Sequence, residues 1–98
     1  MRIIIATNAS TSTVASKNAL TAFLEAKGWS VWHWYDDLWL IDDVPDEINL
    51  IALREEIRKA IPTLPYFMTM AAEGPINHAG MVRKESLEWF KQHWMRNR

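Results

Sequence analysis

The chain has 98 residues and a mass of 11.4 kDa, so we expect one compact domain over residues 1–98. Its 11 basic and 12 acidic residues leave a formal charge of −1, and no basic excess indicates binding to nucleic acid or to an anionic membrane. The sequence has no cysteine, which excludes disulfides, thiolate metal sites and cysteine nucleophiles. No apolar run approaches the roughly 18 residues of a membrane-spanning helix, so we expect a cytoplasmic protein without a membrane partner.

The first predicted elements are a buried strand and an amphipathic helix. Residues 2–7 include three consecutive isoleucines and are apolar on both faces after Arg2, which is typical of a central strand. A helix is predicted over about residues 13–27, because apolar residues recur there at three- and four-residue spacing. Gly28 then supplies a left-handed cap. The residues of the apolar stripe are Ala15, Ala19, Leu20, Phe23 and Leu24.

A tight β-hairpin is predicted next. Residues 29–35 and 38–41 are two strand-like runs, and only Asp36 and Asp37 separate them. If these two acids form the turn, the register follows from counting outward. The opposed pairs are then Tyr35 with Leu38, Trp34 with Trp39, His33 with Leu40, and Trp32 with Ile41. This register places Trp32, Trp34 and Trp39 on the same face of the hairpin.

The second half of the chain adds a helix, a strand and a final helix. The helix begins at Asp46 or Asn49 and ends at Ala60, and a strand is predicted over residues 66–71. Residues 76–82 are predicted to be a loop, and the last helix covers about residues 84–95. This order predicts an α+β fold, a ferredoxin-like split βαβ sandwich with an added C-terminal helix. A flavodoxin-like sheet is the alternative, but it needs more strands than this length comfortably holds.

Six tryptophans are the most unusual feature of the sequence. Four lie at the hairpin and two on the last helix, so they form either a second small core or an aromatic surface for a partner. At about 100° per residue, Leu87, Phe90 and Trp94 share a stripe and Trp89 lies opposite. Trp89 is therefore exposed unless that helix is packed on two sides. The residues predicted to bind a partner are Trp32, Trp34, Trp39, Trp89, Asp42 and Asp43.

An acidic block between residues 36 and 47 holds six acids and no base. It is either a solvated turn and helix N-terminus or a patch complementary to a basic partner. Its spacing does not fit a calcium-binding loop. The histidines His33, His78 and His93 have no second histidine four residues away and no cysteine, so we predict no metal and no cofactor.

The hydroxyl-rich loop over residues 7–13 is a candidate anion site, because it precedes a helix N-terminus. It lacks a glycine that would let the backbone approach a phosphate, so capping of the helix is the alternative. The candidate residues are Thr7, Asn8, Ser10, Thr11 and Ser12. Aromatic rings on an open sheet also stack nucleic-acid bases, but the neighbouring acids repel phosphate, and we do not expect nucleic acid there.

No catalytic signature is visible, because the serines lack the glycine-flanked turn of a nucleophile and the first strand ends without an acid. Our leading hypothesis is a small protein-interaction module, an inhibitor or accessory subunit, that acts through an aromatic surface. We expect its partner to be a second copy of itself, in a homodimer, or another protein. The alternative is an anion- or nucleotide-binding protein, or a nucleic-acid-binding one, that uses the hydroxyl loop or the sheet face.

Overall fold

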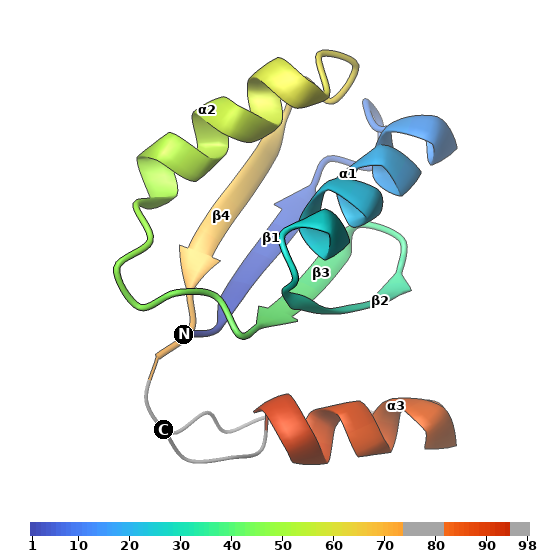
Figure 1. Ribbon diagram of the computed structural model, residues 1–98. Coiled ribbons are helices and arrows are strands. Elements are labelled where there is room, and N and C mark those ends of the chain that lie inside the picture. The colour runs from blue at the N-terminus through green and yellow to red at the C-terminus, as the bar shows by residue number, and fades with distance from the viewer. Residues whose placement is uncertain (74–81, 95–98) are drawn as a thin grey trace.

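The computed structural model describes residues 1–73 and 82–94 of the chain (Figure 1). Within these ranges it is a mixed α+β protein with a four-stranded antiparallel sheet and three helices. The elements are β1 (Ile3–Thr7), α1 (Val14–Ala26), β2 (Ser30–Tyr35), β3 (Leu38–Asp42), α2 (Leu50–Ala60), β4 (Phe67–Ala71), α3 (Lys84–Trp89) and the π-helical turn η1 (Phe90–Trp94) that continues α3. Of the predicted loop over residues 76–82, which includes His78, only Val82 lies within the described residues.

The sheet has the strand order β2-β3-β1-β4, and β1 pairs with both β3 and β4. The central position of β1 confirms the prediction made from its apolar residues. Ile3 and Ile5 are buried on one face of the strand, and Ile4 and Ala6 on the other face are half-buried.

Side chains at the helix ends explain where α1 and α2 begin and where α1 ends. Thr13 caps α1 by accepting from the backbone N–H of Ser16, and Asn49 caps α2 through Ala52. Gly28 has a φ of 81°, which confirms its left-handed position after α1.

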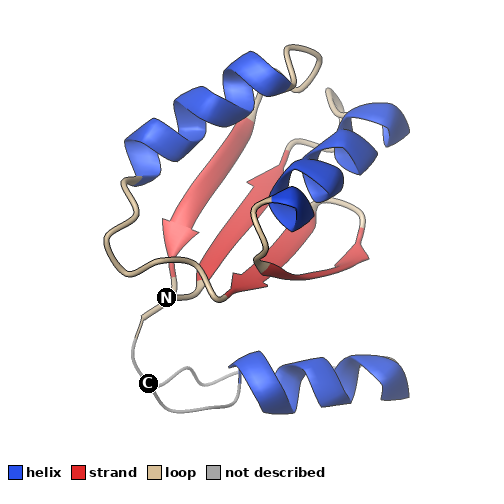
Figure 2. Ribbon diagram, in the orientation of Figure 1, coloured by secondary structure: helices blue, strands red, loops and turns tan. Residues whose placement is uncertain are grey.

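Helices α1 and α2 lie together over one face of the sheet (Figure 2) and bury what we call the main core. Leu20 and Leu24 of α1 are fully buried, while Ala15 and Ala19 of the predicted stripe are exposed. Each fully buried leucine or isoleucine side chain contributes about 1.5–3 kcal/mol. The main core consists of Ile3, Ile5, Leu20, Leu24, Trp39, Ile41, Val44, Leu53, Ile57, Ile61 and Leu64.

The opposite face of the sheet carries a smaller group, the second cluster, formed by Trp32, Leu40, Phe90 and Trp94. Its outer half comes from η1, so α3 and η1 cover part of this face. Arg2 strengthens the contact by donating from Nη1 to the carbonyl oxygen of Trp94 at 2.9 Å. Trp32 and Trp94 thus form a second small core under the last helix, which is one of the two alternatives predicted for the tryptophans.

The predicted hairpin register was wrong beyond the turn. Tyr35 does pair with Leu38, but Trp32 pairs with Leu40 and Val31 with Ile41. His33 and Trp34 together face Trp39, which makes a β-bulge. The extra residue shifts the pairing of residues 30–32 by one, so their side chains lie on the opposite face from the one predicted. Trp32 and Trp39 therefore lie on opposite faces of the sheet, not on the same one.

The predicted stripe of the last helix was wrong at Leu87 and Trp89, although Phe90 and Trp94 are buried together as predicted. Leu87 is 44% exposed, whereas Trp89 is half-buried and its ring lies 5.9 Å from that of Trp94. The cause is η1, because a π-helix is bonded from residue i to i+5 and brings residues five apart onto one face. Trp89 and Trp94 are five residues apart. The assumed angle of about 100° per residue does not hold there.

No helix in the described part of the chain is long and apolar enough to cross a membrane. The cytoplasmic location and the division into one domain stay predictions.

Candidate functional site

The tryptophans of the hairpin have different surroundings. Trp39 is fully buried in the main core, where its Nε1 donates to Thr21 Oγ1 at 2.9 Å and the His33 ring stacks on it. Trp32 is 3% exposed and meets the Phe90 ring edge-on, with the centroids 5.2 Å apart. These two predicted partner-binding residues are core residues within one copy of the chain.

Trp34 is the hairpin tryptophan that reaches the surface, with 53% of its area exposed. It sits in the bulge, and the guanidinium carbon of Arg83 lies 4.9 Å from its ring centroid. This cation–π contact joins β2 to the residue that precedes α3. Among the described hairpin tryptophans, Trp34 is thus the one placed to meet a partner.

An apolar row crosses all four strands beside Trp34. The register places Tyr35 opposite Leu38, Leu38 opposite Ala6, and Ala6 opposite Met68. These four residues share the face that carries the second cluster, because Tyr35 packs edge-on to Trp32 at 5.1 Å. None of the four is buried, and Tyr35 and Met68 are 49% and 59% exposed. We call Tyr35, Leu38, Ala6 and Met68 the open row.

The row next to it is more deeply buried over most of its length. It runs through Trp32, Leu40, Ile4 and Met70, and the first three contact the second cluster or belong to it. Met70, on the edge strand, is 41% exposed. The second cluster therefore covers only one part of this sheet face. It contacts the open row at half-buried Leu38, and no residue of that row is fully buried.

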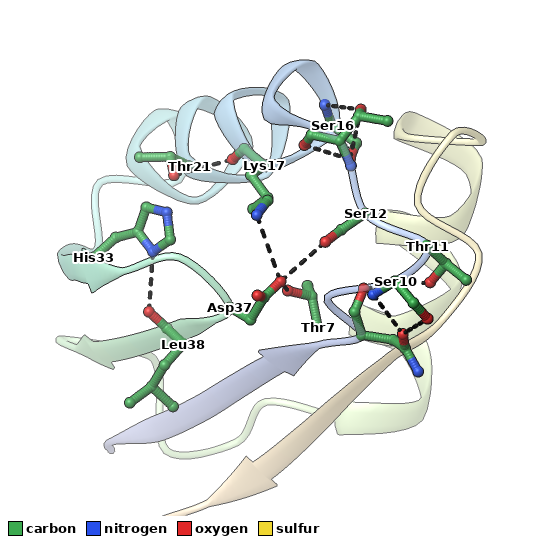
Figure 3. Close-up of polar contacts among 12 residues, drawn as sticks. Thr7, Ser10, Thr11, Ser12, Ser16, Lys17, Thr21, His33, Asp37 and Leu38 are labelled. Atoms are coloured by element: carbon green, nitrogen blue, oxygen red, sulfur yellow. Dashed lines mark hydrogen bonds and ion pairs between the residues drawn. The ribbon is translucent and has the colours of Figure 1, made fainter.

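The hydroxyl loop is organised around an internal carboxylate (Figure 3). The hydroxyls of Thr7 and Ser12 donate to Asp37 Oδ1 at 2.6 and 2.9 Å, and Lys17 Nζ lies 3.7 Å from the same oxygen. The Thr7 hydrogen bond lowers the pKa of Asp37 below its usual range; burial opposes this, and Ser12 and Lys17 add to the lowering. Asp37 therefore fixes the β2–β3 turn against the start of α1.

The remaining candidate anion ligands are used within the loop itself. Asn8 Oδ1 accepts from the backbone N–H and the hydroxyl of Ser10, at 3.0 and 2.6 Å. The carbonyl oxygen of Asn8 accepts from the Thr11 backbone and side chain. The polar groups that suggested an anion site thus hold a turn and a carboxylate, and a carboxylate repels a phosphate.

The acidic residues Asp42 and Asp43 do not form a uniform exposed patch. Asp42 is fully buried, and its Oδ2 lies 2.8 Å from Nδ1 of His93. Asp43 is 49% exposed, with its Oδ2 3.8 Å from the same nitrogen and 2.7 Å from the Ser30 hydroxyl that donates to it. Sequence reasoning treated Asp42 as solvated. Strand alternation was a usable signal, because Asp42 is two residues from buried Leu40 and shares its face.

A shallow groove of about 320 Å³ lies between α2 and β4. Its lining residues are Leu50, Ile51, Arg54, Phe67, Met68 and Thr69. Ile51 is 65% exposed there, and Met68 borders both this groove and the open row. The groove contains no histidine and no carboxylate, so it offers apolar contact without an acid or base for chemistry.

Comparison with known protein families, with curated proteins and with solved structures found no match for this chain. The functional argument therefore rests on the geometry of its own residues.

Proposed function

We propose that this chain is a protein-interaction module that binds a second copy of itself through the open row and Trp34. The observation that carries the proposal is the open row, an apolar band across all four strands that is half-buried at its centre and exposed at both ends in one copy. Exposed apolar bands of this kind mark interfaces, and tryptophan and tyrosine are enriched among the residues that anchor them.

The size of the surface is compatible with a stable dimer. A standard interface buries about 800 Å² on each partner. The accessible surface of this chain is 6257 Å², so such an interface takes about an eighth of it. The open row spans the sheet, and two exposed apolar side chains of the neighbouring positions extend it: Trp34 in the bulge and Met70 of β4.

The charges beside the open row favour a second copy over a strongly charged partner. Asp36 is exposed at the β2–β3 turn, and Arg83 and Lys84 are exposed where α3 begins. Arg83 contacts Trp34, so both signs of charge lie at the same edge of the sheet. A surface that carries both signs can match itself across a two-fold axis, with acid meeting base in each half.

We also infer that the fold is a ferredoxin-like split βαβ sandwich with an added C-terminal helix. The element order β-α-β-β-α-β and the two central strands β1 and β3 support this assignment. It leaves one sheet face free of α1 and α2, which is the face that the proposed dimer uses. A role as an inhibitor or accessory subunit stays a prediction.

Sedimentation velocity at about 1 and 100 μM tests the dimer, because this range brackets a micromolar dissociation constant. We expect Trp34→Ala and Met68→Glu each to weaken self-association by at least about 30-fold, since they remove an anchor and place a charge in the apolar row. Val14→Glu is the matched control, because Val14 is 74% exposed at the start of α1, on the other layer.

A wild-type monomer at 100 μM would contradict the proposal. So would a dimer that Val14→Glu dissociates and Trp34→Ala does not. Loss of the dimer in Met68→Glu alone would place the contact at the β4 edge and the α2 groove instead of the open row.

A further inference from the structure

Asp42, Asp43 and His93 bring three potential metal ligands together from distant parts of the chain. The two aspartates lie at the end of β3, and His93 lies in η1, 51 residues beyond Asp42. One ligand atom from each residue lies within 4.8 Å of the other two. The imidazole nitrogen sets this group apart from an ordinary cluster of surface acids, because nitrogen is a preferred ligand of transition metals.

We propose that these three residues bind one divalent transition-metal ion of the zinc type. An imidazole nitrogen and two carboxylate oxygens are ligands found in tetrahedral zinc sites. Calcium takes six to eight oxygen ligands, and magnesium is held by carboxylates and several waters, so neither ion prefers the imidazole nitrogen that this group supplies. Three protein ligands leave the fourth tetrahedral position for water or for a ligand atom from outside the chain.

The ligands are held in place before any ion arrives. Asp42 is fully buried and His93 has only 17% of its side chain exposed, so both side chains have little freedom. The Ser30 hydroxyl donates to Asp43 Oδ2, which orients the more exposed carboxylate. Hydrogen bonds of this kind to a ligating group are typical of metal sites and raise their affinity.

Binding requires a small rearrangement at His93. The Nδ1 lone pair must face the ion in place of the contact with Asp42, with the ring proton on Nε2. Ligand atoms of a tetrahedral zinc site lie about 3.3 Å apart, given bond lengths of about 2.0–2.1 Å. The Nδ1 to Asp42 Oδ2 distance of 2.8 Å must therefore lengthen by about half an ångström.

A buried cation limits the affinity. Arg2 is 2% exposed, and the antiparallel register places it opposite Asp42, one step beyond the Ile3–Ile41 pair. Its positive charge opposes a divalent ion in the same region. We therefore expect an apparent dissociation constant on the order of micromolar at neutral pH, weaker than that of a zinc finger.

The tag-free chain is titrated with ZnCl₂, and separately with MgCl₂, by calorimetry and by thermal unfolding. We expect one zinc ion per chain, little response to magnesium, and a rise in Tm of roughly 5 °C or more at a hundredfold excess over the dissociation constant. His93→Gln and Asp43→Asn should each lose at least about tenfold in zinc affinity. Glu47→Gln removes a nearby exposed charge and should bind zinc as the wild type does.

Cobalt(II) provides a readout that does not depend on stability, because tetrahedral cobalt absorbs visible light strongly. The band should form in the wild type and in Glu47→Gln and be lost in His93→Gln. Asp43→Asn keeps the test valid if His93→Gln does not fold, since Asp43 is half exposed. The proposal is overturned if zinc and magnesium act alike, if zinc binding does not saturate at one ion, or if neither variant weakens it.

Discussion

Trp39 and Trp32 are both buried and come from the same hairpin, but their indole N–H groups differ. Trp39 donates to Thr21 on α1. Trp32 Nε1 has no hydrogen-bond partner in the described part of the chain, and neither has Trp89 Nε1 or Ser86 Oγ beside the same cluster. Each buried polar group without a partner costs about 1–3 kcal/mol. The indole N–H in the main core thus has a hydrogen-bond partner. The second cluster under α3 is instead destabilised by buried polar groups that have none.

This difference indicates two levels of stability within one small chain. The main core joins α1, α2 and the sheet, and its loss unfolds everything. The second cluster joins α3 and η1 to one part of one sheet face through four buried residues. Segments held by few buried apolar contacts open locally, below the free energy of global unfolding. The C-terminal helix is therefore the part of this fold expected to open first.

The largest expected effect is that of Trp39→Ala. It removes a fully buried ring from the main core, leaves a cavity and removes the donor to Thr21 Oγ1, whose hydroxyl still donates to the Lys17 carbonyl oxygen. We expect a loss of about 3–5 kcal/mol in the free energy of unfolding, measured by urea denaturation. Trp34→Ala on the same strand pair is the control and should cost under about 0.5 kcal/mol in the monomer. Equal losses would show that the division into core and surface is wrong.

The next largest effect is the difference in stability between truncating Trp89 and truncating Leu87. Trp89 contacts the rings of Phe90, His93 and Trp94, whereas Leu87 is 44% exposed. Trp89→Ala should therefore cost about 2 kcal/mol, and Leu87→Ala under about 1 kcal/mol. Hydrogen exchange checks where the loss falls: in Trp89→Ala the amides of residues 84–94 should exchange faster while those of β1 keep their protection. A larger loss for Leu87→Ala than for Trp89→Ala would show that Leu87 is on the buried stripe, as the regular helical spacing predicted.

A smaller contrast tests the unpaired indole directly. Trp39→Phe breaks the hydrogen bond to Thr21, but Trp32→Phe removes a donor that has no partner. Both changes lose similar ring area, so the loss in unfolding free energy should be larger for Trp39→Phe by about 1 kcal/mol or more. Urea denaturation of both variants gives the difference. If Trp32→Phe proves the more damaging, the Trp32 N–H has a partner after all.

Much of the fold could be predicted from the sequence because its signals are local. The apolar residues of β1, the turn at Asp36 and Asp37, and the glycine after α1 each act on their own neighbours. The bulge at His33 and Trp34 carries no such signal, since no glycine or proline marks it. That one extra residue decides which tryptophans are buried together, so the prediction placed Trp32 and Trp39 on one face although they lie on opposite faces.

The polar sites were missed for a different reason. Asp42 and His93 are 51 residues apart, and their contact depends on where η1 lies over the sheet. Asp37 and the loop over residues 7–13 were each noticed, but only the folded sheet brings the carboxylate to the hydroxyls. Pairings between distant elements are set by packing, and local composition does not reveal them.

The smallest expected effect concerns acid and Asp37. Donation by Thr7, with help from Ser12 and Lys17, lowers the pKa of Asp37 in the folded chain below its unfolded value near 3.8. A lowered pKa means that the stabilisation is present above the unfolded pKa and is lost as pH falls through the folded one. Because the side chain is 26% exposed, we expect this contribution to be on the order of 1 kcal/mol or less.

The measurement is urea denaturation of the wild type and of Asp37→Asn between pH 7 and pH 2. The asparagine oxygen still accepts from Thr7 and Ser12 but carries no charge, so the variant is less stable at neutral pH. The two curves should converge as the pH falls below the unfolded value and through the lowered pKa of folded Asp37. Asp36→Asn is the matched control, because Asp36 is the exposed neighbour in the same turn. A constant difference at all pH values would show that Asp37 acts through packing and not through its charge. Convergence would instead show that the turn is held to α1 by an ionised carboxylate, the group that occupies the loop predicted to bind an anion.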